Sequence, residues 1–90
     1  MVEFEWDEHN SEHIRRHGVE PADVEEAMRD PDRRPIPAHQ PRDGERRYGL
    51  TGKSEAGRTI TVIFVRRSGR IRVITARDAD ASERRSYRSR

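Results

Sequence analysis

Arginine, glutamate and tyrosine residues recur in the second half of the sequence at spacings that could bring them together. Arg70 and Arg72 alternate along an apolar run, so in a strand both would lie on one face. Glu83 and Arg84 precede Tyr87 by four and three residues, the spacing of neighbours on one helix face. Arginines on a rigid sheet can bind a phosphate and stabilise the charge that builds up as it becomes pentacoordinate. A carboxylate or histidine nearby could take the proton of a ribose 2′-OH.

These residues belong to a larger constellation for which a structural interpretation is also available. In that interpretation Glu83 caps a helix, Tyr87 packs on the sheet and the arginines are solvated, and spacing alone favours it. The constellation consists of Glu45, Arg47, Tyr48, Arg70, Arg72, Arg77, Glu83, Arg84 and Tyr87.

A second group of possible functional residues is a row of histidines in the first predicted helix. His9, His13 and His17 are spaced by four residues, so they lie on one face. Histidines one turn apart can bind zinc, but the sequence has no HExxH pattern and no cysteine. We therefore expect a solvated or half-buried histidine face, no metal site and no cofactor. His17, beside Gly18, could instead carry a proton, because histidine changes its charge near neutral pH.

Composition and charge narrow the class of protein. Of the 90 residues, 30% are hydrophobic and 40% are charged, which is close to the limit for a chain that folds alone. The sequence is acid-rich up to Asp30 and arginine-rich from Arg58 onward, and it contains a single lysine, Lys53. Such a distribution favours a nucleic-acid partner, although the frequent use of arginine codons in a GC-rich genome would produce the same composition. The absence of cysteine excludes disulfides, and the lack of a long apolar run or signal-peptide pattern predicts a cytoplasmic protein without a membrane span.

Hydrophobic periodicity and turn residues predict an α+β fold in one domain, residues 1–90. The expected order is β-α-α-β-β-β-α, with a small antiparallel sheet flanked by helices. The segment 32–44 contains three prolines and few apolar residues, so it is expected to be an extended, mobile loop. Strands are predicted over residues 2–6, 45–52, 59–65 and 70–77, and helices over 8–17, 21–29 and 80–88.

Five short motifs follow one another along the chain. They are Phe4-Glu5-Trp6-Asp7, Arg16-His17-Gly18-Val19, Glu45-x-Arg47-Tyr48 up to Gly52, Ile71 to Arg77, and Glu83-Arg84-Arg85-x-Tyr87. In their order and spacing these motifs resemble BrnT toxins, a RelE-like family of type II toxin-antitoxin systems. The resemblance implies a metal-independent ribonuclease toxin that inhibits translation and is neutralised by a separately encoded antitoxin. That antitoxin would be a small, BrnA-like DNA-binding protein, and operator DNA would be bound only through the complex.

The resemblance also suggests roles for the candidate residues. The arginines would stabilise the phosphate, Glu83 or His17 would accept a proton, and Tyr87 would donate one or stack on a base. The residues expected to act in cleavage are Arg47, Arg77, Glu83, Arg84, Tyr87 and His17. Those expected to bind RNA are Tyr48, Lys53, Arg70 and Arg72. Two alternatives stand beside this hypothesis: a non-catalytic module that binds an acidic or DNA-binding partner through its arginine face, and a metal-dependent enzyme that uses the histidines.

Overall fold

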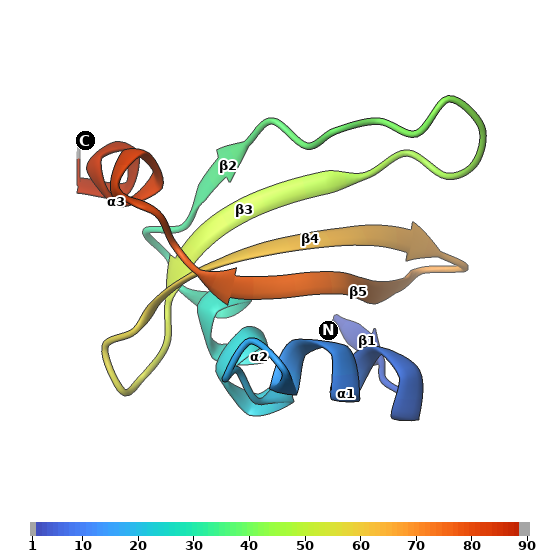
Figure 1. Cartoon of the computed structure of the whole chain (residues 1–90), viewed down its shortest axis with the longest axis horizontal. Helices are drawn as coiled ribbons and strands as arrows, with labels where there is room; N and C mark the ends of the chain where they lie inside the picture. The colour runs from blue at the N-terminus through green and yellow to red at the C-terminus, as the bar shows by residue number, and fades with distance from the viewer. Residues whose placement is uncertain (1, 89–90) are drawn as a thin grey trace.

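The computed structural model of the chain describes residues 2–88 as a five-stranded mixed sheet flanked by three helices (Figure 1). The strands lie in the order β1-β5-β4-β3-β2, and β1 is parallel to β5 while the other neighbours are antiparallel. No helix in this part of the chain is long and apolar enough to cross a membrane. The elements are β1 (Glu3–Glu5), α1 (Glu8–Arg15), α2 (Pro21–Arg29), β2 (Arg34–Ile36), β3 (Tyr48–Lys53), β4 (Thr59–Arg67), β5 (Arg70–Asp78) and α3 (Ala81–Arg88).

The predicted α+β fold is confirmed, with one strand more than expected. Strand β2 lies within the segment that was predicted to be a loop, and it pairs with β3 so that Pro35 is opposite Leu50. A proline lacks the backbone N–H that a central strand needs, but β2 is at the edge of the sheet, where this costs little. The predicted strand over residues 45–52 was also placed too early, because β3 begins at Tyr48.

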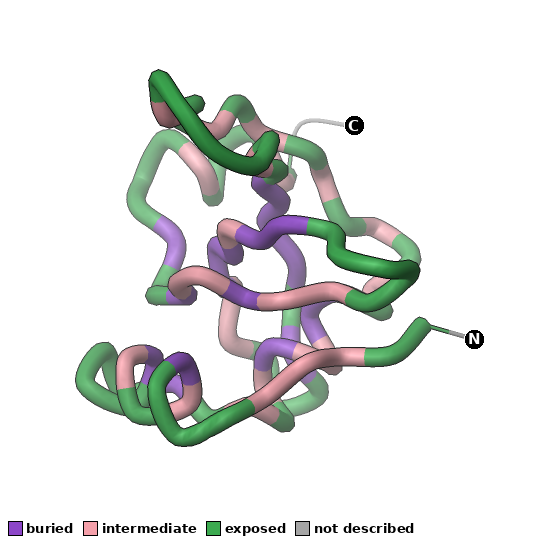
Figure 2. The backbone as a smooth tube through the Cα atoms, turned by 90° about the vertical axis from the view of Figure 1, so that its right-hand side faces the viewer, coloured by how far each residue is buried: buried purple, intermediate pink, exposed green. Residues whose placement is uncertain are grey.

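One face of the sheet carries the hydrophobic core, because α1 and α2 pack against it (Figure 1). Figure 2 shows that the buried positions gather where these helices meet the strands. The fully buried side chains on the two sides of this interface are Ile14, Val19, Val24 and Ala27 from the helical part and Ile60, Val62 and Ala76 from the strands.

Helix α2 approaches the sheet most closely at Gly52 of β3. A Cβ atom at this position would lie 2.1 Å from the carbonyl oxygen of Ala27. Only glycine fits there, because any side chain would push α2 away from the sheet.

Helix α3 lies on the other side of the sheet from α1 and α2 (Figure 1). Its N-terminus is fixed by the predicted capping box: the backbone N–H of Glu83 donates to the Asp80 carboxylate, and that of Asp80 donates to Glu83. The strand register aligns Thr51 with Thr61 and Thr61 with Arg77, so these side chains form a row on the face that α3 covers at one end.

Candidate functional site

Arg77 and Glu83 form a bidentate ion pair at the end of the sheet under α3. The two terminal nitrogens of Arg77 donate to the two carboxylate oxygens of Glu83 at 2.7 and 2.9 Å. The side chain of Glu83 is 14% exposed and that of Arg77 is 44% exposed. The pair therefore presents the edge of the guanidinium to solvent while the carboxylate stays against the sheet.

Glu83 is anchored further by groups that all favour its charged form. The hydroxyl of Thr61 and the backbone N–H of Asp80 each donate to Oε1 at 2.9 Å. These bonds, and above all those from Arg77, lower the pKa of Glu83 from 4.5 to about 2, although partial burial acts in the opposite direction. Arg77 in turn has a raised pKa because Glu83 accepts its hydrogen bonds. A carboxylate of this kind is ionised at neutral pH and is a weak base.

The hydroxyl of Thr61 connects this carboxylate to the interior of the sheet. Thr51 and Thr61 are buried, and their hydroxyl oxygens are 2.9 Å apart. The chain of contacts from Thr51 through Thr61 to Glu83 fixes where α3 begins over the sheet.

Tyr87 and Lys53 meet around the carboxylate of Asp30, which follows α2. The Tyr87 hydroxyl donates to Oδ2 of Asp30 at 2.5 Å, and the backbone N–H of Lys53 donates to the same oxygen at 2.8 Å. Partial burial acts to raise the pKa of Asp30, but the hydrogen bonds from Tyr87 and two backbone N–H groups outweigh it and lower that pKa. The Lys53 ammonium lies 5.7 Å from the centre of the Tyr87 ring. Asp30 was not among the residues predicted to form the site.

Arg84 belongs to the same end of the sheet but contacts the backbone. Its Nη1 donates to the carbonyl oxygen of Ala79 at 2.5 Å, which ties the first turns of α3 to the end of β5. Five of the predicted residues thus lie on α3 or on the strands that it covers. They are Glu83, Arg84 and Tyr87 of α3, Arg77 of β5 and Lys53 of β3.

The remaining predicted arginines and Tyr48 lie away from this cluster. Tyr48 and Lys53 are the first and last residues of β3, which at about 3.4 Å per residue puts their backbones roughly 17 Å apart. Arg70 pairs with Glu3 at 3.4 Å, and Arg72 pairs with Asp7 at 2.9 Å. The Arg72 side chain is only 13% exposed, and its hydrogen bond is the main reason that the pKa of Asp7 is lowered.

Glu45 and Arg47 were predicted to lie within a strand, which would put both side chains on one face, but both residues precede β3. Glu45 instead pairs with Arg67 at 2.7 Å, and the backbone of Arg47 is held by the side-chain amide of Gln40. Arg47 nevertheless lies close to the strands, since it lines a groove with Arg67 and Ile74.

The histidine row of α1 is partly engaged in packing. His13 is within hydrogen-bond distance, 3.1 Å, of the Thr75 hydroxyl, and its ring meets the ring of His17 edge-on at 5.3 Å. Across residues 2–88, no three or more His, Cys, Asp or Glu residues cluster as metal ligands would. His17 itself is exposed.

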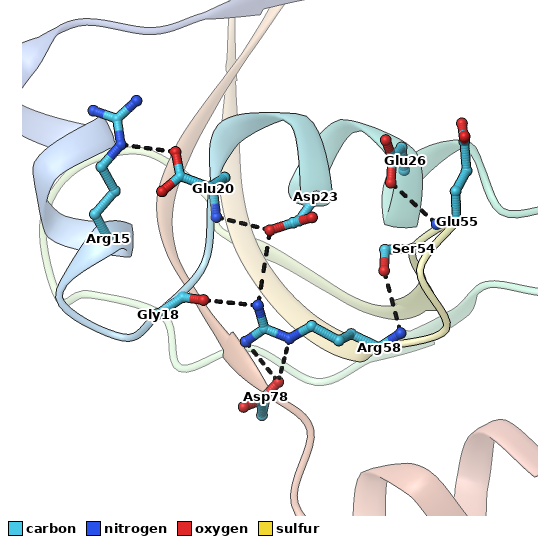
Figure 3. A network of polar contacts seen from close by, with 9 residues as sticks. All are labelled: Arg15, Gly18, Glu20, Asp23, Glu26, Ser54, Glu55, Arg58 and Asp78. Atoms are coloured by element: carbon cyan, nitrogen blue, oxygen red, sulfur yellow. Dashed lines mark hydrogen bonds and ion pairs between the residues drawn. The ribbon is translucent and has the colours of Figure 1, made fainter.

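Arg58, which was not among the predicted site residues, joins the turn at Gly18 to Asp78 at the end of β5 (Figure 3). Its guanidinium donates to the Gly18 carbonyl at 2.7 Å and to the Asp78 carboxylate at 2.9 Å, and it lies 3.8 Å from Asp23. Because Gly18 follows His17 and Asp78 follows Arg77, this contact places the two predicted residues at the same end of the sheet. They lie on opposite faces of it, since α1 and α3 are on different sides of the sheet (Figure 1).

Comparison with known families decides the class of protein. Residues 6–83 match the family described as ribonuclease toxin, BrnT, of type II toxin-antitoxin systems. The chain belongs to this family. Comparison with curated proteins gives no match. The predicted resemblance and the predicted ribonuclease toxin function are thereby confirmed, and a toxin of this type implies a cognate antitoxin. The matched part of the toxin includes Arg47, Arg77 and Glu83, whereas Arg84 and Tyr87 lie beyond it.

Proposed function

We propose that this toxin cleaves RNA at the end of the sheet under α3, by attack of a ribose 2′-OH on the adjacent phosphorus and without a metal ion. The observation that carries this proposal is that α3 holds a cation at each of two successive turns. Glu83 binds Arg77, and one turn later the ring of Tyr87 has the Lys53 ammonium 5.7 Å from its centre. In the reaction a P–O2′ bond forms and the P–O5′ bond breaks, which leaves a cyclic phosphate and a free 5′-OH. Side-chain cations supply the positive charge that this transition state requires.

Arg77 is suited to contact the reacting phosphate without leaving Glu83. Its Nη1 hydrogens are used by Glu83 and by the Asp78 carbonyl, and one Nη2 hydrogen is used by Glu83. The Nε–H and the second Nη2 hydrogen lie along one edge of the guanidinium, and a phosphate can accept from both. Glu83 thus orients Arg77, and Arg84 fixes the backbone from which α3 starts.

His17 is the better candidate for the proton acceptor. A base with a pKa of about 2, such as Glu83, is far from the range near neutrality in which general bases work best. His17 is exposed at the same end of the sheet, on the side of α1, where Arg58 holds its turn. RNA bound under α3 would therefore have to pass around this end of the sheet to bring its 2′-OH to His17 (Figure 1). The proton of the 2′-OH would pass to His17. The Tyr87 hydroxyl, which donates its proton to Asp30 in this structure, would turn from that carboxylate to supply the proton to the leaving O5′.

RNA on either side of the cleaved bond would contact Arg47, Tyr48, Arg70 and Arg72. Arg70 is the more accessible of the two β5 arginines, because its side chain is 51% exposed and contacts Glu3 through one nitrogen. The Arg72 side chain is 13% exposed and paired with Asp7, so it would offer RNA only the part of its guanidinium that reaches the surface. These contacts would hold the strand across the sheet without taking part in the chemistry.

The proposal is tested with purified, antitoxin-free protein, single-stranded RNA and an excess of chelator. Wild-type protein should cleave, and Arg77→Lys should cleave about 100-fold more slowly, because lysine keeps the charge beside Glu83 but loses the planar edge. Arg16→Lys is the matched control, since Arg16 is exposed and its side chain contacts no carboxylate among residues 2–88. Loss of wild-type cleavage in chelator would contradict the metal-free mechanism, and an unchanged rate for Arg77→Lys would contradict the site.

The assignment of the proton acceptor needs its own pair of variants. His17→Ala should lower kcat by about 100-fold or more. His9→Ala, on the same helix and also exposed, should leave kcat unchanged. Equal kcat values for His17→Ala and His9→Ala would show that His17 is not the proton acceptor.

A further inference from the structure

A groove of about 430 Å³ lies at the opposite end of β3 from Lys53, between the sheet and the segment that follows α2. This size is within the usual range of small-ligand sites. The groove does not overlap the cluster under α3, because it shares none of its residues. Among the residues that form its walls are Pro31, Arg33, Pro35, Tyr48, Phe64 and Arg66.

The floor of the groove is a pair of stacked aromatic rings flanked by cations. The ring of Tyr48 stacks on that of Phe64 with centres 5.6 Å apart, and Tyr48 is 36% exposed whereas Phe64 is 6% exposed. The guanidinium of Arg66 lies 5.3 Å from the centre of the Tyr48 ring, and that of Arg46 lies 5.8 Å from it. Phe64 therefore supports a half-exposed ring that has positive charge beside it.

The two guanidiniums beside the Tyr48 ring, Arg66 in the groove wall and Arg46 just before β3, differ from several sheet arginines in their ion pairing. Arg67, Arg70 and Arg72 are each paired with an acidic side chain. Within the described part of the chain, neither Arg46 nor Arg66 contacts a carboxylate. No acidic residue lines the groove either. The positive potential around Tyr48 is therefore not neutralised by the protein itself.

We propose that this groove is a second nucleotide-binding site, which holds one nucleotide of the single-stranded RNA substrate away from the cleaved bond. The base stacks on the exposed part of the Tyr48 ring and the guanidinium groups beside it. Arg46 and Arg66 also bind the phosphates on either side of this nucleotide. This inference rests on the proposed function, since it takes RNA as the substrate. An acidic segment of the antitoxin could also bind these arginines, and the test below separates that outcome from RNA binding.

The position of the groove suggests the path of the RNA. Arg66 and Arg67 are consecutive in β4, so their side chains lie on opposite faces of the sheet. Arg67 lines the groove that also contains Arg47, whereas Arg66 lines the groove of Tyr48. An RNA strand that passes around this end of the sheet would meet cations on both faces.

The test measures binding of a fully 2′-O-methylated single-stranded RNA to antitoxin-free protein by fluorescence anisotropy. This RNA lacks the attacking hydroxyl, so binding is separated from cleavage. Tyr48→Leu keeps an apolar contact with Phe64 but removes the stacking surface, and it should weaken binding between about 5-fold and about 150-fold. Arg66→Gln should also weaken binding and should reduce the slope of log K against log salt by about 0.7, the loss of one phosphate contact.

Arg16→Gln is the control, because Arg16 is equally exposed and lies at the end of α1, outside the groove. It should bind as the wild type does. The proposal would be overturned if Tyr48→Leu and Arg66→Gln both bound the RNA with wild-type affinity. If these two variants bound RNA normally but no longer bound the cognate antitoxin, the groove would be a site for the antitoxin instead. If the wild type binds this RNA through the groove but cleaves no RNA, the proposed function fails while the groove assignment stands.

Discussion

Replacing Glu83 with glutamine should reveal how much the ion pair with Arg77 stabilises the fold. The pKa of Glu83 is lowered from 4.5 to about 2 in the folded protein. At about 1.36 kcal/mol for each unit, this difference corresponds to at most about 3.4 kcal/mol of stability at neutral pH. The Arg77 side chain is 44% exposed, and water around it screens the interaction. We therefore expect Glu83→Gln to reduce the free energy of unfolding by about 1–2 kcal/mol at pH 7.

The same change should alter the dependence of stability on pH in a defined window. Because the folded-state pKa of Glu83 is lower than its ordinary value, its contribution is fully present above pH 4.5 and is lost as the pH falls through about 2. The wild type should lose this stability over that window. The variant lacks the titrating carboxyl, so its free energy of unfolding should fall less steeply there.

Urea denaturation, followed by circular dichroism at pH 7, 5, 4 and 3, measures both effects. Glu12→Gln is the control, because Glu12 is exposed and its carboxylate contacts no cation among residues 2–88. This variant should match the wild type at each pH. Equal stability of Glu83→Gln and wild type at pH 7, or parallel pH profiles, would refute the argument that Arg77 lowers the pKa of Glu83.

Two further substitutions test other contacts around the site. Gly52→Ala should destabilise the protein by about 3 kcal/mol or more, because the new Cβ would lie 2.1 Å from the backbone oxygen of Ala27. Gly49→Ala should cost less, since its nearest neighbour is a side-chain carbon at 2.9 Å; thermal unfolding that ranks the two in the reverse order would contradict the close approach of α2. Tyr87→Phe should reduce the free energy of unfolding by about 1–2 kcal/mol through loss of the bond to Asp30. Urea denaturation measures this loss, and unchanged stability would show that the bond contributes nothing.

The sequence alone was sufficient for the elements whose pattern is local. Helix α2 was predicted over its observed residues because Pro21 begins it and Pro31 follows its end. Strands β4 and β5 were predicted because they are long and apolar, and each extends slightly beyond its predicted end. Strand β2 was missed because its three residues include a proline, and only the partner β3 makes it a strand.

The candidate site was partly predictable for the same reason. The spacing of Glu83, Arg84 and Tyr87 on one helix face and the capping box with Asp80 are local features, and both are present. Which strand α3 covers depends on the register that sets Thr61 beside Arg77, and no short-range pattern encodes it.

Asp30 and Arg58 are separated from their partners by long stretches of sequence. Asp30 binds a hydroxyl that is 57 residues away in the chain, and Arg58 binds a carbonyl that is 40 residues away. Contacts of this kind are set by how the elements pack, so they could not be predicted from residue spacing.

Charge pairing in the fold changes what the basic composition means for function. The acid-rich first third of the chain and the arginine-rich second half are brought together, so that Glu3 and Asp7 pair with arginines of β5 and Asp23 lies beside Arg58. Part of the apparent charge separation in the sequence is therefore cancelled within the molecule. The cations proposed to act on RNA are local groups, chiefly the outer edge of the Arg77 guanidinium under α3 and the arginines around Tyr48. Recognition of RNA would then depend on the positions of a few arginines and not on a broad basic surface.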